Sequence, residues 1–158
     1  MMFLFFTLII RFMYCLCYTS KKTASFDINE LKEILVKSRI NNEKKDITGI
    51  LLLIDDLFIQ ILEGEQNDLD ELYDVIKKDD RHDYIQKIYS GEIATRNFLT
   101  WSMGFQQVTW EDLEELGMER LHDKSLSLSE YFRHKSHYLI EVIKEFNKSS
   151  ELKLNLPK

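Results

Sequence analysis

Proline, glycine and cysteine are scarce in this sequence. Its 158 residues include one proline and five glycines, a composition that argues against disordered segments and long linkers. The two cysteines, Cys15 and Cys17, are spaced wrongly for a CxxC redox motif. No cluster of cysteine and histidine has the spacing of a zinc site, so no metal is expected. We therefore expect reduced thiols in a packed core, as in a cytoplasmic protein.

Positive charge is limited as well. The 21 lysines and arginines are outnumbered by 27 aspartates and glutamates, which gives a net charge of −6, and no basic run exceeds two residues. A nucleic-acid surface needs a basic patch to neutralise phosphates, so direct binding of nucleic acid is not expected. The sequence also shows no Ser-His-Asp arrangement and no pair of acids placed for hydrolysis. We therefore expect no enzymatic activity.

The hydrophobic content is sufficient for one packed domain. Hydrophobic residues make up 44% of the chain and aromatic residues 12%. Residues 1–12 form an apolar stretch that Arg11 interrupts, and the stretch is too short to span a bilayer. No basic residue precedes it and no small-residue cleavage site follows it. We therefore predict an extension outside the core, from an upstream start codon or of non-native origin, with membrane attachment as the alternative.

Hydrophobic periodicity predicts one α+β domain over residues 13–108. Alternating apolar residues predict strands and a period of 3.6 predicts helices, and Asp27 and Glu30 have the spacing of a capping box. The resulting order is β-α-β-β-α-β-β, the ferredoxin-like sandwich with two helices on one face of a sheet. The strands are expected at 13–19, 46–54, 58–63, 84–93 and within 98–108, with helices capped by Asp27 and Asn67.

A helical extension is predicted for residues 109–158. Glu111–Leu116 is expected to form a short acidic helix, followed by a longer helix at about residues 129–147. The longer helix carries two apolar stripes. We expect one stripe to pack on the free face of the sheet and the other to support self-association or partner binding, with burial against the sheet as the alternative. The stripes are Phe132, Leu139, Ile143 and Phe146, and Tyr131, Tyr138 and Val142.

Gln60 is the most informative polar residue, because it lies in the otherwise apolar segment Phe58–Leu62. Burying its amide costs on the order of 1–3 kcal/mol unless the amide finds partners. Tyr18 and Asn42 are also polar side chains on apolar elements, and the predicted sandwich can bring all three to one pocket. Such a set suits a planar heteroaromatic ligand with donors and acceptors along its edge. The simpler alternatives are a core glutamine bonded to backbone, a sheet tyrosine and a helix C-cap at Asn42.

Six segments resemble motifs of the BLUF (blue light using flavin) photoreceptor family. Each segment is short, and each alone is a weak signal. Together they occur in the family's order and with its spacing over about residues 13–107, and this joint register carries the resemblance. The segments are Leu16–Ser20, Ser38–Asn42, Asp46–Gly49, Phe58–Gly64, Asp80–His82 and Trp101–Met103.

The resemblance implies a blue-light photoreceptor that binds a flavin noncovalently, usually FAD, with FMN or riboflavin as alternatives. It assigns Tyr18 as the photoactive tyrosine, Gln60 as the switching glutamine and Asn42 as the residue that bonds the edge of the flavin ring. It places Trp101 and Met103 in the signal relay that starts at Gln60. The other flavin-binding residues that it implies are Ile34, Ser38, Asn41, Ile76, Arg81 and His82.

Output is expected through an unidentified partner protein or a homo-oligomer, because residues 109–158 are too few for a cyclase or phosphodiesterase domain. Two other classes of protein use the same fold. An acylphosphatase-like hydrolase needs a glycine-containing phosphate loop, and residues 18–22 contain no glycine. An RNA-binding module needs an aromatic strand motif, which the sequence lacks, and its acidic balance is unfavourable. Both remain alternatives to a light sensor.

Overall fold

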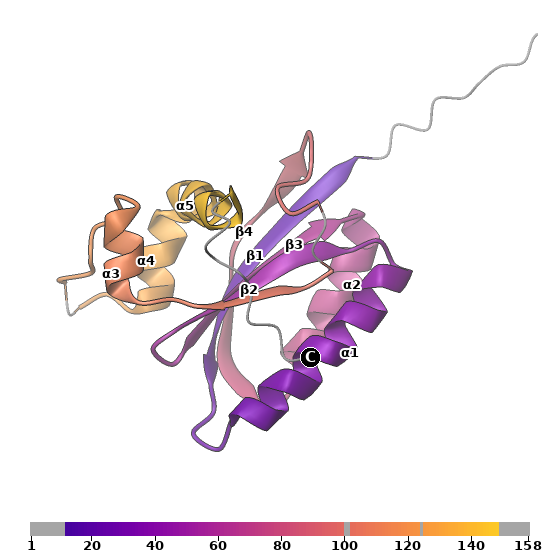
Figure 1. Cartoon of the computed structure of the whole chain (residues 1–158), viewed down its shortest axis with the longest axis horizontal. Coiled ribbons are helices and arrows are strands. Elements are labelled where there is room, and N and C mark those ends of the chain that lie inside the picture. The colour runs from indigo at the N-terminus through magenta and orange to yellow at the C-terminus, as the bar shows by residue number, and fades with distance from the viewer. Residues whose placement is uncertain (1–11, 100–101, 124, 149–158) are drawn as a thin grey trace, which may run out of the picture.

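Five strands and five helices make up the described part of the chain. The computed structural model describes residues 12–99, 102–123 and 125–148 (Figure 1). The elements are, in chain order, β1 (Met13–Lys22), α1 (Ile28–Lys44), β2 (Thr48–Ile54), β3 (Leu57–Gly64), α2 (Gln66–Lys77), β4 (His82–Ile93), β5 (Gly104–Gln107), α3 (Trp110–Glu115), α4 (Leu128–His134) and α5 (Ser136–Lys148).

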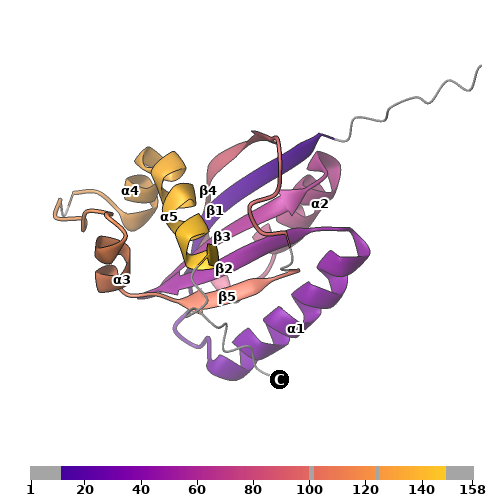
Figure 2. The same ribbon diagram turned by 45° about the horizontal axis from the view of Figure 1, so that its top comes forward.

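A mixed sheet of five strands lies at the centre, in the order β4-β1-β3-β2-β5. Neighbouring strands are antiparallel except β2 and β5, which run parallel. The helices α1 and α2 cover one face of the sheet, and α3, α4 and α5 gather on the other (Figures 1 and 2). The prediction of a ferredoxin-like α+β fold with a C-terminal helical extension is confirmed.

Alternation along β1 divides the core into two layers. Leu16 and Tyr18 belong to the inner core, which α1 and α2 cover, whereas Cys15 and Cys17 belong to the outer core beneath α4 and α5. Side chains two positions apart share one face of a strand, so this is the division that the sequence pattern predicts. Because both faces are covered, residues 15–20 of β1 are all buried.

The two long helices of the inner layer begin for different reasons. Asp27 and Glu30 form the predicted capping box at the start of α1. The helix α2 has Glu65 as its N-cap instead of the predicted Asn67, and no side-chain hydrogen bond caps it. The chain enters α2 directly from Gly64 at the end of β3. The helix therefore begins where the strand ends, and no side-chain cap marks its start in the sequence.

The last strand lies within the predicted window 98–108 and occupies only a short part of it. β5 begins at Gly104, and Phe98, which was expected in the strand region, is completely buried ahead of it. The buried carboxylate of Glu63 on β3 accepts hydrogen bonds from the backbone N–H groups of Asn97 (2.8 Å) and Phe98 (3.1 Å). A backbone N–H group that is bonded to a side chain is withdrawn from the sheet ladder, so these two residues are held beside β3 without such ladder bonds.

The predicted helix at about residues 129–147 is two helices, α4 and α5, which are separated at Lys135. Phe132, Leu139 and Ile143 of the first predicted stripe are nevertheless all completely buried in the outer core, as expected. Tyr131 and Val142, predicted to face a partner, are buried in the outer core, whereas Tyr138 is 42% exposed. The prediction of an outward stripe is wrong for Tyr131 and Val142, and their burial, the alternative, is confirmed.

Within the described ranges, no helix is both long enough and apolar enough to cross a bilayer. Of the apolar segment 1–12, Phe12 alone falls within those ranges, and its side chain is exposed. The predictions for residues 1–11 and for Trp101 therefore concern parts of the chain outside the described residues.

The close packing of β2 against β3 predicts the effects of two glycine substitutions. A Cβ at Gly49 would lie 2.1 Å from the backbone carbonyl oxygen of Ile61, whereas a Cβ at Gly91 would meet the movable hydroxyl of Tyr89 at 2.8 Å. We expect Gly49→Ala to lower the free energy of unfolding by about 3 kcal/mol or more. Gly91→Ala, the control, should lower it by less than about 1 kcal/mol. Urea denaturation measures both, and equal losses would contradict the prediction.

Candidate functional site

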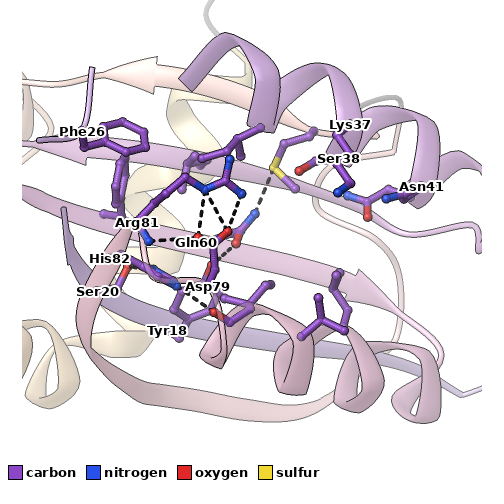
Figure 3. Close-up of a pocket in the computed structure, with 18 residues that line it drawn as sticks. Tyr18, Ser20, Phe26, Lys37, Ser38, Asn41, Gln60, Asp79, Arg81 and His82 are labelled. Atoms are coloured by element: carbon purple, nitrogen blue, oxygen red, sulfur yellow. Dashed lines mark hydrogen bonds and ion pairs between the residues drawn. The ribbon is translucent and has the colours of Figure 1, made fainter. Parts of the chain in front are cut away.

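A cleft opens between α1, α2 and the inner face of the sheet (Figure 3). Its walls contain every predicted site residue except Trp101, which lies outside the described residues. The predicted convergence of Tyr18, Asn42 and Gln60 is therefore present, while their roles toward a flavin stay predictions. The predicted residues that line the cleft are Tyr18, Ile34, Ser38, Asn41, Asn42, Gln60, Ile76, Arg81, His82 and Met103.

A chain of side-chain hydrogen bonds crosses the floor of the cleft. Tyr18 on β1 and Gln60 on β3 are direct cross-strand neighbours. The Tyr18 hydroxyl donates to Oε1 of Gln60, and Nε2 of Gln60 donates to the sulfur of Met103 at 3.2 Å. The amide of Gln60 is thus satisfied by two side chains from different elements. The alternative of a core glutamine bonded to backbone is wrong.

The phenol of Tyr18 is held in its protonated form. Burial raises the pKa of Tyr18 well above its usual value, and the neighbouring Tyr73, Cys17 and Asp79 raise it further. A buried phenolate would be an uncompensated charge in an apolar layer. Tyr18 is therefore a hydrogen-bond donor to Gln60 over the whole physiological pH range.

The C-terminal half of α1 holds the segment that leads into β5. Nδ2 of Asn42 donates to the carbonyl oxygen of Ser102 at 2.7 Å, and Nε of Arg39 donates to the carbonyl oxygen of Met103 at 3.0 Å. The helix continues beyond Asn42 to a C-cap at Lys45. Asn42 is therefore not a C-cap residue, and its side chain links α1 to the backbone beside Met103.

His82, the first residue of β4, connects three elements at one end of the cleft. Its Nε2 lies 2.8 Å from the carbonyl oxygen of Ile76 on α2, and its Nδ1 lies 2.8 Å from the hydroxyl of Ser20 on β1. A carbonyl oxygen can only accept, so Nε2 carries a proton. In the neutral ring, Nδ1 then accepts from the Ser20 hydroxyl. The hydrogen bonds fix both the tautomer and the orientation of the ring.

Arg81 brings positive charge into the cleft together with its own counter-ion. Figure 3 shows the guanidinium meeting the carboxylate of Asp79, and Nε of Arg81 donates to Oδ1 of Asp79 at 2.9 Å. Hydrogen bonding from the Arg81 side chain holds the pKa of Asp79 below its usual value. Lys37 on α1 also lines the cleft, so the wall carries two lysine or arginine cations and one carboxylate.

Several lining residues escaped the sequence analysis. Ser20 could have been found, because it lies two positions after Tyr18 and so shares its strand face. Asp79 and Phe26 lie between elements, where neither alternation nor helical periodicity gives a signal. The lining residues that were missed are Ser20, Phe26, Lys37, Leu51, Phe58, Leu72, Val75 and Asp79.

Comparison with known proteins agrees with this geometry. The family described as "BLUF: Sensors of blue-light using FAD" matches residues 13–104. The chain belongs to the BLUF family. BLUF proteins are sensors of blue light that use a flavin, so membership favours the photoreceptor over the hydrolase and the RNA-binding module that share this fold.

The similar proteins include a curated relative and two solved structures. The chain is 31% identical over 83 residues to "Photoactivated adenylate cyclase subunit beta" of Euglena longa, a match that covers 52% of this chain and 10% of that protein. The chain thus spans about a tenth of the length of the curated BLUF relatives it matches. The structure "BlsA ground state" is 27% identical, with a TM-score of 0.69, and 92% of this chain and 95% of that chain are covered. "BlrB - a BLUF protein, dark state structure" is 29% identical, with a TM-score of 0.67 and coverage of 85% and 97%.

The ion pair in the cleft predicts a pH dependence of stability. Because the pKa of Asp79 is lowered in the folded protein, its contribution is fully present above its unfolded pKa of about 3.9 and is lost as the pH falls through the folded value. We expect Asp79→Asn to be less stable than the parent at pH 6 by up to about 1 kcal/mol, since the pair is partly exposed. Below about pH 4 the difference should shrink.

Urea denaturation of the parent and Asp79→Asn at pH 6 and at low pH measures this effect. Asp74→Asn is the control, because it removes an exposed pair with Lys77 at the same helix end, which is expected to change stability little. A difference between the parent and Asp79→Asn that grows as the pH falls would contradict the assignment.

Proposed function

We propose that this chain senses blue light through a flavin held between α1 and α2, with a hydrogen-bond switch made by Tyr18 and Gln60. The observation that carries the proposal is the buried chain Tyr18–Gln60–Met103. In this chain a phenol donates to an amide whose two hydrogen-bond partners among the described residues are both side chains. FAD is the proposed flavin, and FMN and riboflavin are the alternatives. The supporting observation is the family match, whose description names FAD.

The residues of the cleft fit such a ligand. Ile34 and Ile76 come from α1 and α2 and would pack against the flat ring. Asn42 uses Nδ2 for Ser102, which leaves its Oδ1 acceptor for an N–H group at the ring edge. Ser38 and Asn41 on α1 add further polar groups to the same wall. Arg81 and Lys37 would supply donors for the phosphate-bearing tail, and His82, whose ring nitrogens already bond to Ile76 and Ser20, would fix the wall beside that tail.

Tyr18 and Gln60 can exchange a proton without help from solvent. When bound, the flavin supplies the absorption of blue light and an acceptor for an electron. Loss of an electron from Tyr18 makes its hydroxyl strongly acidic, and Oε1 of Gln60 already accepts a hydrogen bond from that hydroxyl. Because burial penalises an isolated charge on either group, the electron and the proton leave Tyr18 together, and the proton goes to Oε1 of Gln60. The electron and one proton of Gln60 then return and restore the phenol. Return of the proton from Oε1 leaves an amide that has turned, whereas return of a proton from Nε2 leaves the imidic tautomer.

A turned Gln60 changes its contact with Met103. Turning exchanges Oε1 and Nε2, so an oxygen would face the sulfur that now accepts from Nε2. A thioether has no proton to donate, so this contact would lose its hydrogen bond and Met103 would be released. The two networks would differ by about 1–3 kcal/mol, the value of one or two buried hydrogen bonds. Met103 and Trp101 are the proposed relay, because Met103 leads directly into β5.

We assign the sensing domain to residues 13–108 and an output and capping role to residues 109–158. The support is that α4 and α5 bury the outer face of the sheet, where they can respond to changes in the strands. The proposed output is a change in binding of a downstream partner protein or in self-association to a homo-oligomer, without enzymatic activity in this chain and in a cytoplasmic setting. The name of the Euglena longa relative describes light control of a cyclase in that protein, which supports regulation of another domain or protein.

The absorption spectrum of the purified protein tests the proposal. We expect a yellow protein whose spectrum shifts reversibly to the red under blue light, because the hydrogen bonds at the ring edge change, and whose released flavin is FAD. A colourless protein that FAD, FMN and riboflavin all fail to reconstitute would contradict the proposal.

Tyr18→Phe and Gln60→Leu should each retain flavin and lose the red-shifted state. The first variant has no proton to transfer, and the second has no amide to turn. Tyr73→Phe is the matched control, because Tyr73 lies beside Tyr18, with ring centroids 5.5 Å apart, and its hydroxyl is not bonded to Gln60. Difference spectra before and after blue light give the result. A full shift in Tyr18→Phe would exclude Tyr18 as the donor.

Asn42→Ala should weaken flavin binding. The variant leaves a polar ring edge without a partner, a loss of about 1–3 kcal/mol, which corresponds to a Kd that is about fivefold to 150-fold higher. Glu43→Ala, an exposed neighbour on α1, serves as the control. Titration of the apoprotein followed by flavin fluorescence measures both. Parent-like affinity in Asn42→Ala would mean that Asn42 serves only to hold Ser102.

A further inference from the structure

Three consecutive hydroxyl-bearing side chains on β1 are almost completely buried. Tyr18, Thr19 and Ser20 are 3%, 0% and 0% exposed. Tyr18 and Ser20 line the cleft, where they are bonded to Gln60 and His82. Because side chains alternate along a strand, Thr19 faces the opposite layer, beneath the C-terminal helices. The switch proposed above uses Tyr18 and leaves this intervening hydroxyl without a role.

Thr19 is bonded to helix α4. Its hydroxyl donates a buried hydrogen bond to the hydroxyl of Ser129, at 2.9 Å. One turn further along α4, the guanidinium of Arg133 donates to the side-chain oxygen of Gln86 at 3.1 Å. Gln86 is the residue of β4 that pairs with Thr19 in the ladder between β1 and β4. One face of α4 is therefore attached by two hydrogen bonds to a single cross-strand pair, directly beside Tyr18.

The ladder between β1 and β4 is irregular on both sides of this pair. Its register shifts between Cys17 and Tyr18 and again between Thr19 and Lys21. Tyr84, in the second irregularity, has a left-handed φ of 52°. Extra residues in one strand interrupt the pairing and bend the strand locally, and such features are frequent beside functional sites. The irregularity is confined to the side of β1 that faces β4, since Tyr18 and Thr19 keep a regular pairing with Gln60 and Ile59 of β3.

We propose that Thr19 is a positioning residue that couples the hydrogen-bonding state of Tyr18 to the docking of α4, through its bond to Ser129. The inference rests on the proposed function, since it takes the Tyr18–Gln60 bond as the group that light changes. A change in that bond shifts the backbone of β1 at Tyr18, and the next residue carries the shift through the sheet to α4. This path leaves the sheet on its outer face, whereas the path through Met103 leaves it at the edge strand β5.

A coupling of this kind acts in both directions. If light alters the contact between Thr19 and Ser129, then removal of that contact must alter the balance between the lit and dark states of the switch, although Ser129 is on the far side of the sheet from the cleft. A bond that serves only packing would change the stability of the fold and would leave both the light response of α4 and the dark recovery unchanged.

The test uses the full chain loaded with FAD. Hydrogen exchange read by mass spectrometry compares the α4 amides, residues 128–134, in blue light and in the dark, and absorption follows dark recovery. The variants are Thr19→Val, which keeps the shape of the side chain and removes its hydroxyl, Ser129→Ala, and the two combined. Tyr131→Phe is the matched control, because it removes a hydrogen bond of α4 that goes to the backbone of Glu119 and not to the sheet.

We expect the light-dependent change in α4 exchange to fall about fivefold or more in either single variant. The double variant should lose no more than the singles, since both remove the same bond. Dark recovery should change in the same three variants and the red shift should persist in all of them. Tyr131→Phe should keep the parental light response and recovery.

A parental light response of α4 in Thr19→Val and Ser129→Ala would overturn the inference. So would a parent whose spectrum shifts while α4 exchange stays constant. If Thr19→Val does not fold, Ser129→Ala decides alone, because Ser129 lies outside the sheet and the cleft. A parent with no flavin or no spectral shift would instead contradict the proposed function, and the inference would fall with its premise.

Discussion

The buried amide of Gln60 is the interaction on which the inner half of the molecule depends. An amide in an apolar layer is stable only with partners on its donor and acceptor sides, and those partners come from β1 and from the residue before β5. β1 and the segment before β5 must therefore keep fixed positions relative to β3. The hydrogen bonds of Asn42 and Arg39 hold the same segment from α1. The contacts that make the core stable thus also shape the cleft.

Much of this arrangement could be predicted because it is local. The alternation of Tyr18 with Cys17 along β1 assigns each side chain to one layer of the core, and the capping box at Asp27 sets the start of α1. The lining of the cleft was predictable for a different reason, since motifs on separate elements matched one family in order and spacing. Ser20 shows the limit of that approach, because it occupied the right strand face and still was not singled out.

The features that escaped prediction depend on contacts between distant parts of the chain. Glu63 accepts hydrogen bonds from backbone donors 34 and 35 positions away, and Thr19 is bonded to Ser129 across 110 positions. Neither pairing leaves a periodic signal near either partner. The break between α4 and α5 at Lys135 also gives no signal in the sequence, because the residues around it are compatible with a continuous helix. Tertiary packing decided each of these cases.

Cys15 and Cys17 lie beneath α4 and α5, so the reactivity of their thiols depends on whether these helices cover them. Burial raises the pKa of Cys15 to about 12 and raises that of Cys17 well above its usual value. The thiolate is the reactive form of cysteine, so both thiols are unreactive toward thiol reagents while the helices remain in place. The rate at which a thiol reagent modifies Cys15 and Cys17 therefore measures how often α4 and α5 separate from the sheet. The native chain reports this motion without any added label.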